Sequence, residues 1–158
     1  MDQMNEWSSE QRESVGRVRV LYEALGSKDV ETVHRLLAPD LEWWFHGPPS
    51  HQYLMRLLTG ASSSFVFAPI SVVPFGPNFV LAEGYDTKRA VSWVHAWTIT
   101  DGIITHVKEY LNTSVTVKCF SSAADGNSPS ASPPPNCQSV WQSKVWGESV
   151  VPALVLAL

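Results

Sequence analysis

The apolar positions before residue 60 recur at the spacing of amphipathic helices, and they predict three helices. The first is expected over 8–25, where a serine and a glutamine have the spacing of a capping box. The second begins after an N-cap at Asp29 and ends before Pro39, because proline cannot continue a helix. A short third helix is expected between Ser50 and Gly60. The residues predicted to share one face of each helix are Val15, Val18, Tyr22 and Leu25, then Val30, Val33, Leu36 and Leu37, then Leu54, Leu57 and Leu58.

From residue 65 onward the helical pattern gives way to β-branched and aromatic residues, which predict four long antiparallel strands. A shorter strand over 41–46 precedes them. The pair Asp101-Gly102 favours a two-residue type I′ hairpin, in which Thr100 pairs with Ile103. The four long strands are expected over 64–75, 78–86, 89–100 and 103–120.

Residues 41–51, LEWWFHGPPSH, place three aromatic rings and two histidines around a Gly-Pro-Pro turn. Alternate residues of a strand point to opposite faces, so Trp43 and Phe45 are expected on one face and Trp44 and His46 on the other. The stretch is therefore expected to wall an apolar pocket rather than to perform proton transfer.

The same alternation divides the predicted hairpin into two faces. One face mixes large rings with imidazole and ammonium groups, a composition typical of a subunit interface, and is expected to point outward. The other carries smaller residues and a carboxylate, and is expected to line the concave side. The alternative is that these tryptophans line the pocket and the interface lies elsewhere, because a one-residue bulge would exchange the two faces. The outward set is Trp93, His95, Trp97, His106, Lys108 and Tyr110, and the concave set includes Val94, Val107, Glu109 and Leu111.

Composition and charge narrow the class of protein. The 158 residues are 44% apolar and 16% charged, which fits one folded domain. The net charge of -4, with scattered Lys and Arg, argues against nucleic acid as a partner. The N-terminal stretch lacks the basic and apolar blocks of a signal peptide, and the longest apolar run is too short to span a membrane. A cytoplasmic protein is therefore expected.

The chain is expected to divide into a domain over 8–120, a flexible Ser/Pro linker over 121–136 and an apolar C-terminal tail over 137–158. Because a tail this apolar is costly to leave in water, it is expected to dock on its own domain or on a partner. Cys119 and Cys137 are expected to be free thiols, with a disulfide that clips the ends of the linker as the alternative.

The order of these elements resembles the nuclear transport factor 2-like superfamily, a cone-shaped α+β fold that includes ketosteroid isomerase and the SnoaL-like cyclases. Within it, the stretches HGPPSHQYLMRLLTG and VSWVHAWTITDGIITHVKEYLNTS, and the tail CQSVWQSK, resemble the plant wound-induced protein family. The resemblance implies a curved antiparallel sheet wrapped around three N-terminal helices, and a homodimer formed through one face of that sheet. It also implies an association with wounding, stress or senescence, but no activity.

The isomerases of this superfamily use an Asp base together with a Tyr and a protonated Asp. The matching positions fall on or near Phe45, Leu21 and Ala96, so steroid isomerase chemistry is not expected. His46 and Glu109 remain as acid–base candidates, since imidazole exchanges protons near neutral pH and a carboxyl group among apolar side chains is a recurrent catalytic acid. The alternative is that His46 hydrogen-bonds the turn and Glu109 satisfies a helix or an arginine. The histidines lack a third ligand, so no metal or other cofactor is expected.

These features favour a stress-response protein whose pocket binds a small hydrophobic ligand and which has no demonstrable catalytic set. One alternative is a SnoaL-like cyclase, isomerase or hydrolase that uses His46 or Glu109. Another is an interaction module that presents its tail and its tryptophan face. The predicted pocket residues are Tyr22, Trp43, Phe45, His46, Val94, Val107, Glu109 and Leu111.

Overall fold

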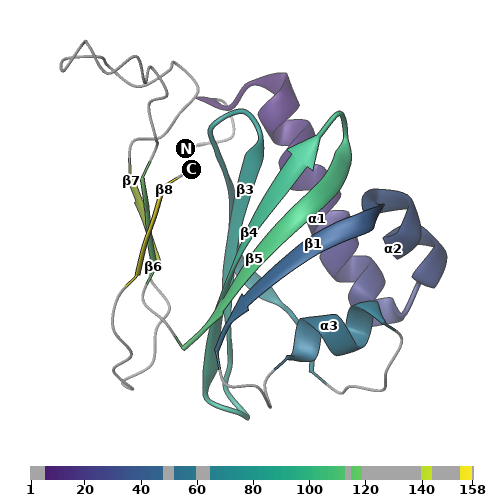
Figure 1. Cartoon of the computed structure of the whole chain (residues 1–158), viewed down its shortest axis with the longest axis vertical. Coiled ribbons are helices and arrows are strands. Elements are labelled where there is room, and N and C mark those ends of the chain that lie inside the picture. Colours follow the sequence, from purple (N-terminus) through teal and green to yellow (C-terminus); the bar gives the residue numbers. More distant parts are fainter. Residues whose placement is uncertain are drawn as a thin grey trace.

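The computed structural model describes residues 6–47, 52–59, 65–112, 115–118, 140–143 and 154–157. Helices lie on one side of a five-stranded sheet, and a small three-stranded sheet lies on the other side (Figure 1). We call the face under the helices the inner face and the opposite one the outer face. The expected α+β architecture, a curved sheet around N-terminal helices, is confirmed.

The helices begin where the sequence predicts. Helix α1 spans Ser9–Ser27, and the predicted capping box is present, because Ser8 and Gln11 each accept a hydrogen bond from the other's backbone N–H at 3.0 Å. Helix α2 spans Val30–Leu36 and is capped by Asp29. Helix α3 spans Tyr53–Leu58. The predicted cap of α3, Ser50, lies outside the described residues.

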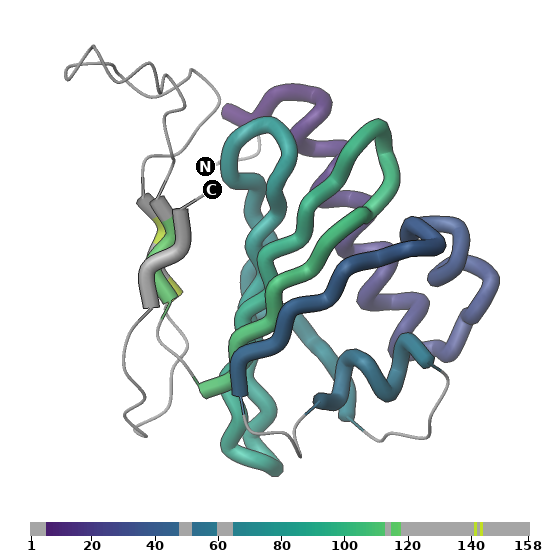
Figure 2. Tube along the Cα trace, viewed as in Figure 1, coloured from purple at the N-terminus to yellow at the C-terminus, as the bar shows by residue number. Residues whose placement is uncertain are grey.

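The five-stranded sheet has the order β1-β5-β4-β3-β2. Strands β2 to β5 are antiparallel neighbours, as predicted, but β1 runs parallel to β5, so the sheet is mixed. Figure 2 traces how β1 and β5, far apart in the sequence, come to lie side by side. The strand bounds are β1 Leu37–His46, β2 Pro69–Phe75, β3 Phe79–Asp86, β4 Val91–Thr100 and β5 Ile103–Leu111.

The last predicted strand is wrong in one respect, since it is two strands in different sheets. Strand β5 ends at Leu111, and Asn112 adopts a left-handed φ of 52°, which bends the backbone. Strand β6, Val115–Lys118, then pairs with β7, Val140–Gln142, and β8, Leu154–Ala157. The described parts of the apolar tail, β7 and β8, therefore pair with the same chain. The predicted linker and both cysteines lie outside the described residues.

The two faces of the sheet bury two apolar clusters. The larger one fills the space between the helices and the inner face, and it includes Val18, Leu21 and Trp97, each at 0% exposure. The smaller one joins the outer face to the three-stranded sheet through Tyr110, Val117 and Trp141 among others. None of the described helices has the length and apolar character needed to cross a membrane.

The hairpin turn is confirmed, but the predicted register beyond it is wrong. Asp101 and Gly102 both have positive φ, 53° and 81°, as a type I′ turn requires. Thr100 pairs with Ile103 and Ile99 with Ile104, but the next pair is Thr98 with His106. Thr105 is thus an extra residue, a bulge. From this point each β4 residue faces a partner one position further along β5. The β4 residues therefore lie on the face opposite to the predicted one, whereas the β5 residues keep their predicted faces.

Gly84 gives a test of this packing. It pairs with Trp93, and a Cβ added at Gly84 would meet the Trp93 indole, with only 2.6 Å to Cε2. Because Trp93 is buried and cannot swing aside, Gly84→Ala is expected to lower the free energy of unfolding by about 1–3 kcal/mol. Chemical denaturation monitored by circular dichroism measures this change.

The matched control is Gly16→Ala in helix α1, where an added Cβ meets nothing within 4 Å. That change is expected to stabilise the protein by roughly 0.5–1 kcal/mol, because alanine loses less backbone entropy in a helix than glycine. Equal stability of Gly84→Ala and the wild type would contradict the inward placement of Trp93.

Candidate functional site: a buried Tyr–His–Glu chain

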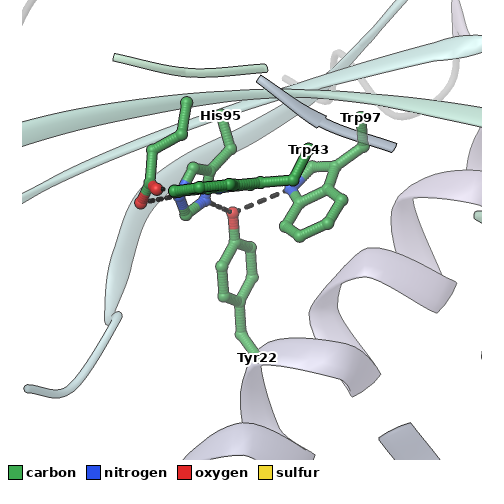
Figure 3. Close-up of polar contacts among 5 residues, drawn as sticks. Tyr22, Trp43, His95 and Trp97 are labelled. Atoms are coloured by element: carbon green, nitrogen blue, oxygen red, sulfur yellow. Dashed lines mark hydrogen bonds and ion pairs between the residues drawn. The ribbon is translucent and has the colours of Figure 1, made fainter. Parts of the chain in front are cut away.

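A chain of polar side chains crosses the apolar inner cluster. Tyr22, on the buried stripe of helix α1, points its hydroxyl at the sheet, where it lies between His95 and Trp97 (Figure 3). The phenol oxygen is 2.6 Å from His95 Nδ1 and accepts a hydrogen bond from Trp97 Nε1 at 2.9 Å. The helix and strand β4 are thereby joined by polar contacts within a dry core.

The chain continues across the sheet to Glu109. His95 on β4 is the direct partner of Glu109 on β5, a pairing that exists because of the bulge. His95 Nε2 lies 2.9 Å from Glu109 Oε2, and both side chains are 0% exposed. The second carboxylate oxygen, Oε1, accepts a hydrogen bond from Trp43 Nε1 at 3.2 Å. Four elements, α1, β1, β4 and β5, therefore meet at one carboxylate–imidazole–phenol chain.

Aromatic rings enclose His95. The ring centroids of Trp93, Phe67 and Trp97 lie 4.7, 5.0 and 5.3 Å from that of His95, and the Tyr22 ring is nearly parallel to it at 5.8 Å. These rings exclude water from the imidazole, so its polar atoms must be satisfied by other side chains. In the described part of the chain, no buried side-chain nitrogen or oxygen is left without a hydrogen-bond partner.

The two indoles fix the direction of the protons. An indole N–H can only donate, so Trp97 uses the Tyr22 oxygen as acceptor and Trp43 uses Glu109 Oε1. The Tyr22 proton then has His95 Nδ1 as its acceptor, which leaves the ring proton on Nε2 to be donated to Glu109 Oε2. A doubly protonated imidazole would instead aim its Nδ1–H at the Tyr22 proton. In this arrangement the phenol donates, the imidazole accepts at Nδ1 and donates at Nε2, and the carboxylate accepts at both oxygens.

Burial raises the pKa of the Tyr22 phenol well above its ordinary value of 10.0. The hydrogen bond from Trp97 opposes this shift and the Glu109 charge adds to it. Tyr22 therefore keeps its proton throughout the neutral and mildly alkaline range and remains a donor to His95. The direction of the chain is fixed over that range.

Several of the residues predicted for the pocket lie together. Tyr22, Val107 and Leu111 are in the inner cluster, and Trp43 and Phe45 are half-buried against it with their rings stacked at 5.2 Å. Glu109 lies among them. The alternation predicted for β1 holds, because Trp44 is 50% exposed on the opposite face.

Two residues predicted for the pocket lie on the outer side. Val94 packs in the outer cluster, because the bulge turns it away from the helices. The His46 ring lies 6.1 Å from that of Trp44 and 6.2 Å from that of Tyr110, which belongs to the outer cluster. Of the two acid–base candidates, only Glu109 faces the helices. Gly47 does not turn His46 inward.

The predicted outward set is divided by the bulge. Trp93, His95 and Trp97 lie on the inner face with exposures of 1%, 0% and 0%, so their outward placement was wrong. Tyr110 packs toward the three-stranded sheet, and His106 is half-exposed, paired with Glu42 at 3.6 Å. Lys108 follows the same alternation to the outer face. The prediction assumed an unbroken register from the turn.

Sequence reasoning missed His95 and Trp97 as members of the site. A signal was present, because shifting the hairpin by one residue places His95 opposite Glu109. That shift pairs an imidazole with a carboxylate and puts both tryptophans in the core. The isomerase positions are apolar, as expected, with Leu21 in the inner cluster and Ala96 in the outer one. Within the described residues, no group of three or more His, Cys, Asp or Glu side chains is placed to hold a metal ion.

Comparison with protein families gives a match over residues 55–158 to the family described as wound-induced protein WI12. Senescence associated gene 20 of Arabidopsis thaliana is 50% identical over 111 residues, and wound-induced protein 1 of Solanum tuberosum is 45% identical over 111 residues. Each match covers 66% of this chain and 100% of the relative.

Solved structures share the fold. Bal32a from a soil-derived mobile gene cassette has a TM-score of 0.52 at 16% identity, covering 65% of this chain and 92% of that one. An NTF2-like protein from Burkholderia xenovorans has a TM-score of 0.49 at 27% identity, covering 64% and 90%. The likeness to Bal32a agrees with the α+β architecture of helices against one face of a curved sheet. The family match includes His95, Trp97 and Glu109, whereas Tyr22 and Trp43 precede it.

Tyr22→Phe tests the buried chain. The change leaves His95 Nδ1 without its donor and Trp97 Nε1 without its acceptor, so the free energy of unfolding is expected to fall by about 1–3 kcal/mol at neutral pH. The wild type should also lose stability above about pH 10, because the unfolded phenol ionises there while the folded one, with its raised pKa, does not.

The stability that Tyr22 contributes is complete below its unfolded pKa and is lost as the pH rises toward its folded pKa. Tyr22→Phe should therefore show a shallower alkaline decline, while retaining the part due to Tyr110, whose pKa burial also raises. The melting temperatures of the wild type and Tyr22→Phe, measured from neutral pH to above the pH at which an unfolded tyrosine ionises, compare the two declines. Parallel declines would contradict the burial of an un-ionised Tyr22.

Proposed function

The chain belongs to the wound-induced protein WI12 family of plants, and on that premise we propose that it binds a small apolar molecule on the inner side of the cone, beside Glu109. The observation that carries the proposal is the Glu109 carboxyl group, fully buried and hydrogen-bonded to the His95 imidazole and the Trp43 indole. A buried carboxyl group lowers the stability of the fold relative to an apolar side chain of similar size. Its presence therefore favours a role in function.

The surroundings of Glu109 support this proposal. Strand β1 and helix α3 contribute apolar side chains that are only half-buried, so this border of the inner cluster is open to water while its interior is not. A border of this kind, apolar with a few convergent polar groups, is typical of small-molecule sites. The half-buried residues are Leu37, Leu41, Trp43, Phe45, Tyr53, Leu57 and Leu58.

Binding can be tested with N-phenyl-1-naphthylamine, a neutral apolar dye that fluoresces when it leaves water. The dye is expected to bind and to shift the methyl NMR signals of Leu54, Val107 and Leu111, which lie in the inner cluster. The methyl signals of Val94 and Val117, in the outer cluster, serve as the internal control and should not move. No binding, or shifts confined to the outer cluster, would refute an inner-face site.

A second candidate function is acid–base catalysis by the same chain, because a carboxylate, an imidazole and a phenol in series can pass a proton. Incubation with neutral cyclic ketones in D2O would reveal proton abstraction as deuterium at the carbon beside the carbonyl. Glu109→Gln should abolish the exchange and His46→Ala should leave it intact. Exchange unaffected by Glu109→Gln would remove this candidate.

The predicted homodimer remains a proposal, in a form that the bulge changes. The tryptophan face is buried, and part of the outer face lies under the three-stranded sheet. The remaining surface carries the exposed Trp44 beside Glu42 and His106, and a large ring next to polar groups suits pairing with a second copy of itself. Light scattering on the full chain tests this, and a dimer unaffected by Trp44→Glu would exclude this surface.

A further inference from the structure

Trp43 differs from the other two tryptophans of the inner face. Trp93 and Trp97 are 1% and 0% exposed, whereas Trp43 is half-buried at the end of the chain formed by Tyr22, His95 and Glu109. One edge of its indole reaches the Glu109 carboxylate, and one face stacks on Phe45, with 5.2 Å between ring centroids and 26° between planes. In Figure 3 the Trp43 ring is seen edge-on beside the other members of the chain.

The hydrogen bond from Trp43 meets a requirement of Glu109. The carboxylate receives one donor from His95 at Oε2 and one from Trp43 at Oε1. If the indole turned into solvent, Oε1 would remain beside an apolar wall without a donor, which is costly for a buried charge. A molecule that takes the place of the indole must therefore supply a donor at the same point.

We propose that the Trp43 indole occupies the binding slot of the ligand, and that the ligand is a neutral, flat, apolar ring compound that carries an N–H donor on its edge. This inference rests on the inner-face site proposed above and names the chemical class that the site accepts. The Trp43 indole shows the shape and polarity that the slot accepts. The slot is bordered by Phe45 on the ring face and by Glu109 at the donor edge.

The same geometry determines what the slot rejects. A ring without a donor leaves Glu109 Oε1 unsatisfied, and an anionic ligand places a second negative charge beside the carboxylate. Indole should therefore bind better than benzothiophene, which has the same shape and a sulfur in place of the N–H. Indole should also bind better than indole-3-carboxylate, which adds the negative charge.

The first experiment uses the full-length wild-type protein and the indole N–H signals of its seven tryptophans. The Trp43 signal is identified by its absence from the Trp43→Phe spectrum. Titration with indole should shift this signal toward that of a solvent-exposed indole, because the ligand displaces it, and the Trp97 signal should stay in place. Binding of indole that leaves the Trp43 signal unchanged would overturn the proposal.

The second experiment uses Trp43→Ala, which removes the indole and leaves its space. Calorimetry should give about tenfold or more tighter binding of indole than of benzothiophene, since only indole restores the donor to Glu109. Adding Glu109→Gln should remove that preference. Equal affinities for the two compounds in Trp43→Ala would overturn the proposal.

The two proposals fail in different ways. If N-phenyl-1-naphthylamine binds the inner face but indole and benzothiophene bind Trp43→Ala equally, the slot is wrong and the binding function stands. If none of the three compounds binds the wild type or Trp43→Ala, both proposals fail. Should Trp43→Ala not fold, as circular dichroism would show, the wild-type titration alone decides the matter.

Discussion

The hydrogen bond between His95 and Glu109 is the contact on which the rest of the inner face depends. It joins two neighbouring strands inside an apolar cluster, at 2.9 Å and with neither side chain exposed. Each partner also contacts a further element. His95 contacts the Tyr22 hydroxyl of helix α1, and Glu109 accepts a hydrogen bond from the Trp43 indole of strand β1. A buried polar pair is tolerated only when every donor and acceptor is matched, so these contacts fix the positions of four elements together.

The two faces of the five-stranded sheet pack against different parts of the chain. The outer face is partly covered by strands of the same chain, which pack Val117 and Trp141 against Tyr110. The inner face holds the polar chain and borders the half-buried rings of β1 and α3. The match to the wound-induced family covers His95, Trp97 and Glu109, while Tyr22 and Trp43 come from the preceding part of the chain. The polar chain is therefore completed by residues that lie before the matched region.

Much of the fold follows from the sequence by local rules. The capping box at Ser8, the cap at Asp29 and the type I′ turn at Asp101-Gly102 each depend on residues close together in the chain, and each is present. The alternation within β1 is also local, and it places Trp43 and Phe45 against the core as predicted.

What the sequence did not determine is the register of the long hairpin. A bulge at Thr105 changes no local preference, yet it reverses the faces of Trp93, His95 and Trp97. Its energetic reason lies in distant contacts, because only the shifted register lets His95 meet both Glu109 and Tyr22. The same applies to the parallel pairing of β1 with β5, which no short-range pattern specifies.

The most direct test of this account is the protonation of the His95 ring, measured by 15N NMR on the full-length protein at neutral pH. A chain that runs from Tyr22 to Glu109 has a proton on His95 Nε2 and a bare Nδ1 that accepts from Tyr22. The Nδ1 signal should therefore have the shift of an unprotonated nitrogen, and it should change in Tyr22→Phe. A proton on Nδ1, or two equivalent protonated nitrogens, would contradict the direction of the chain.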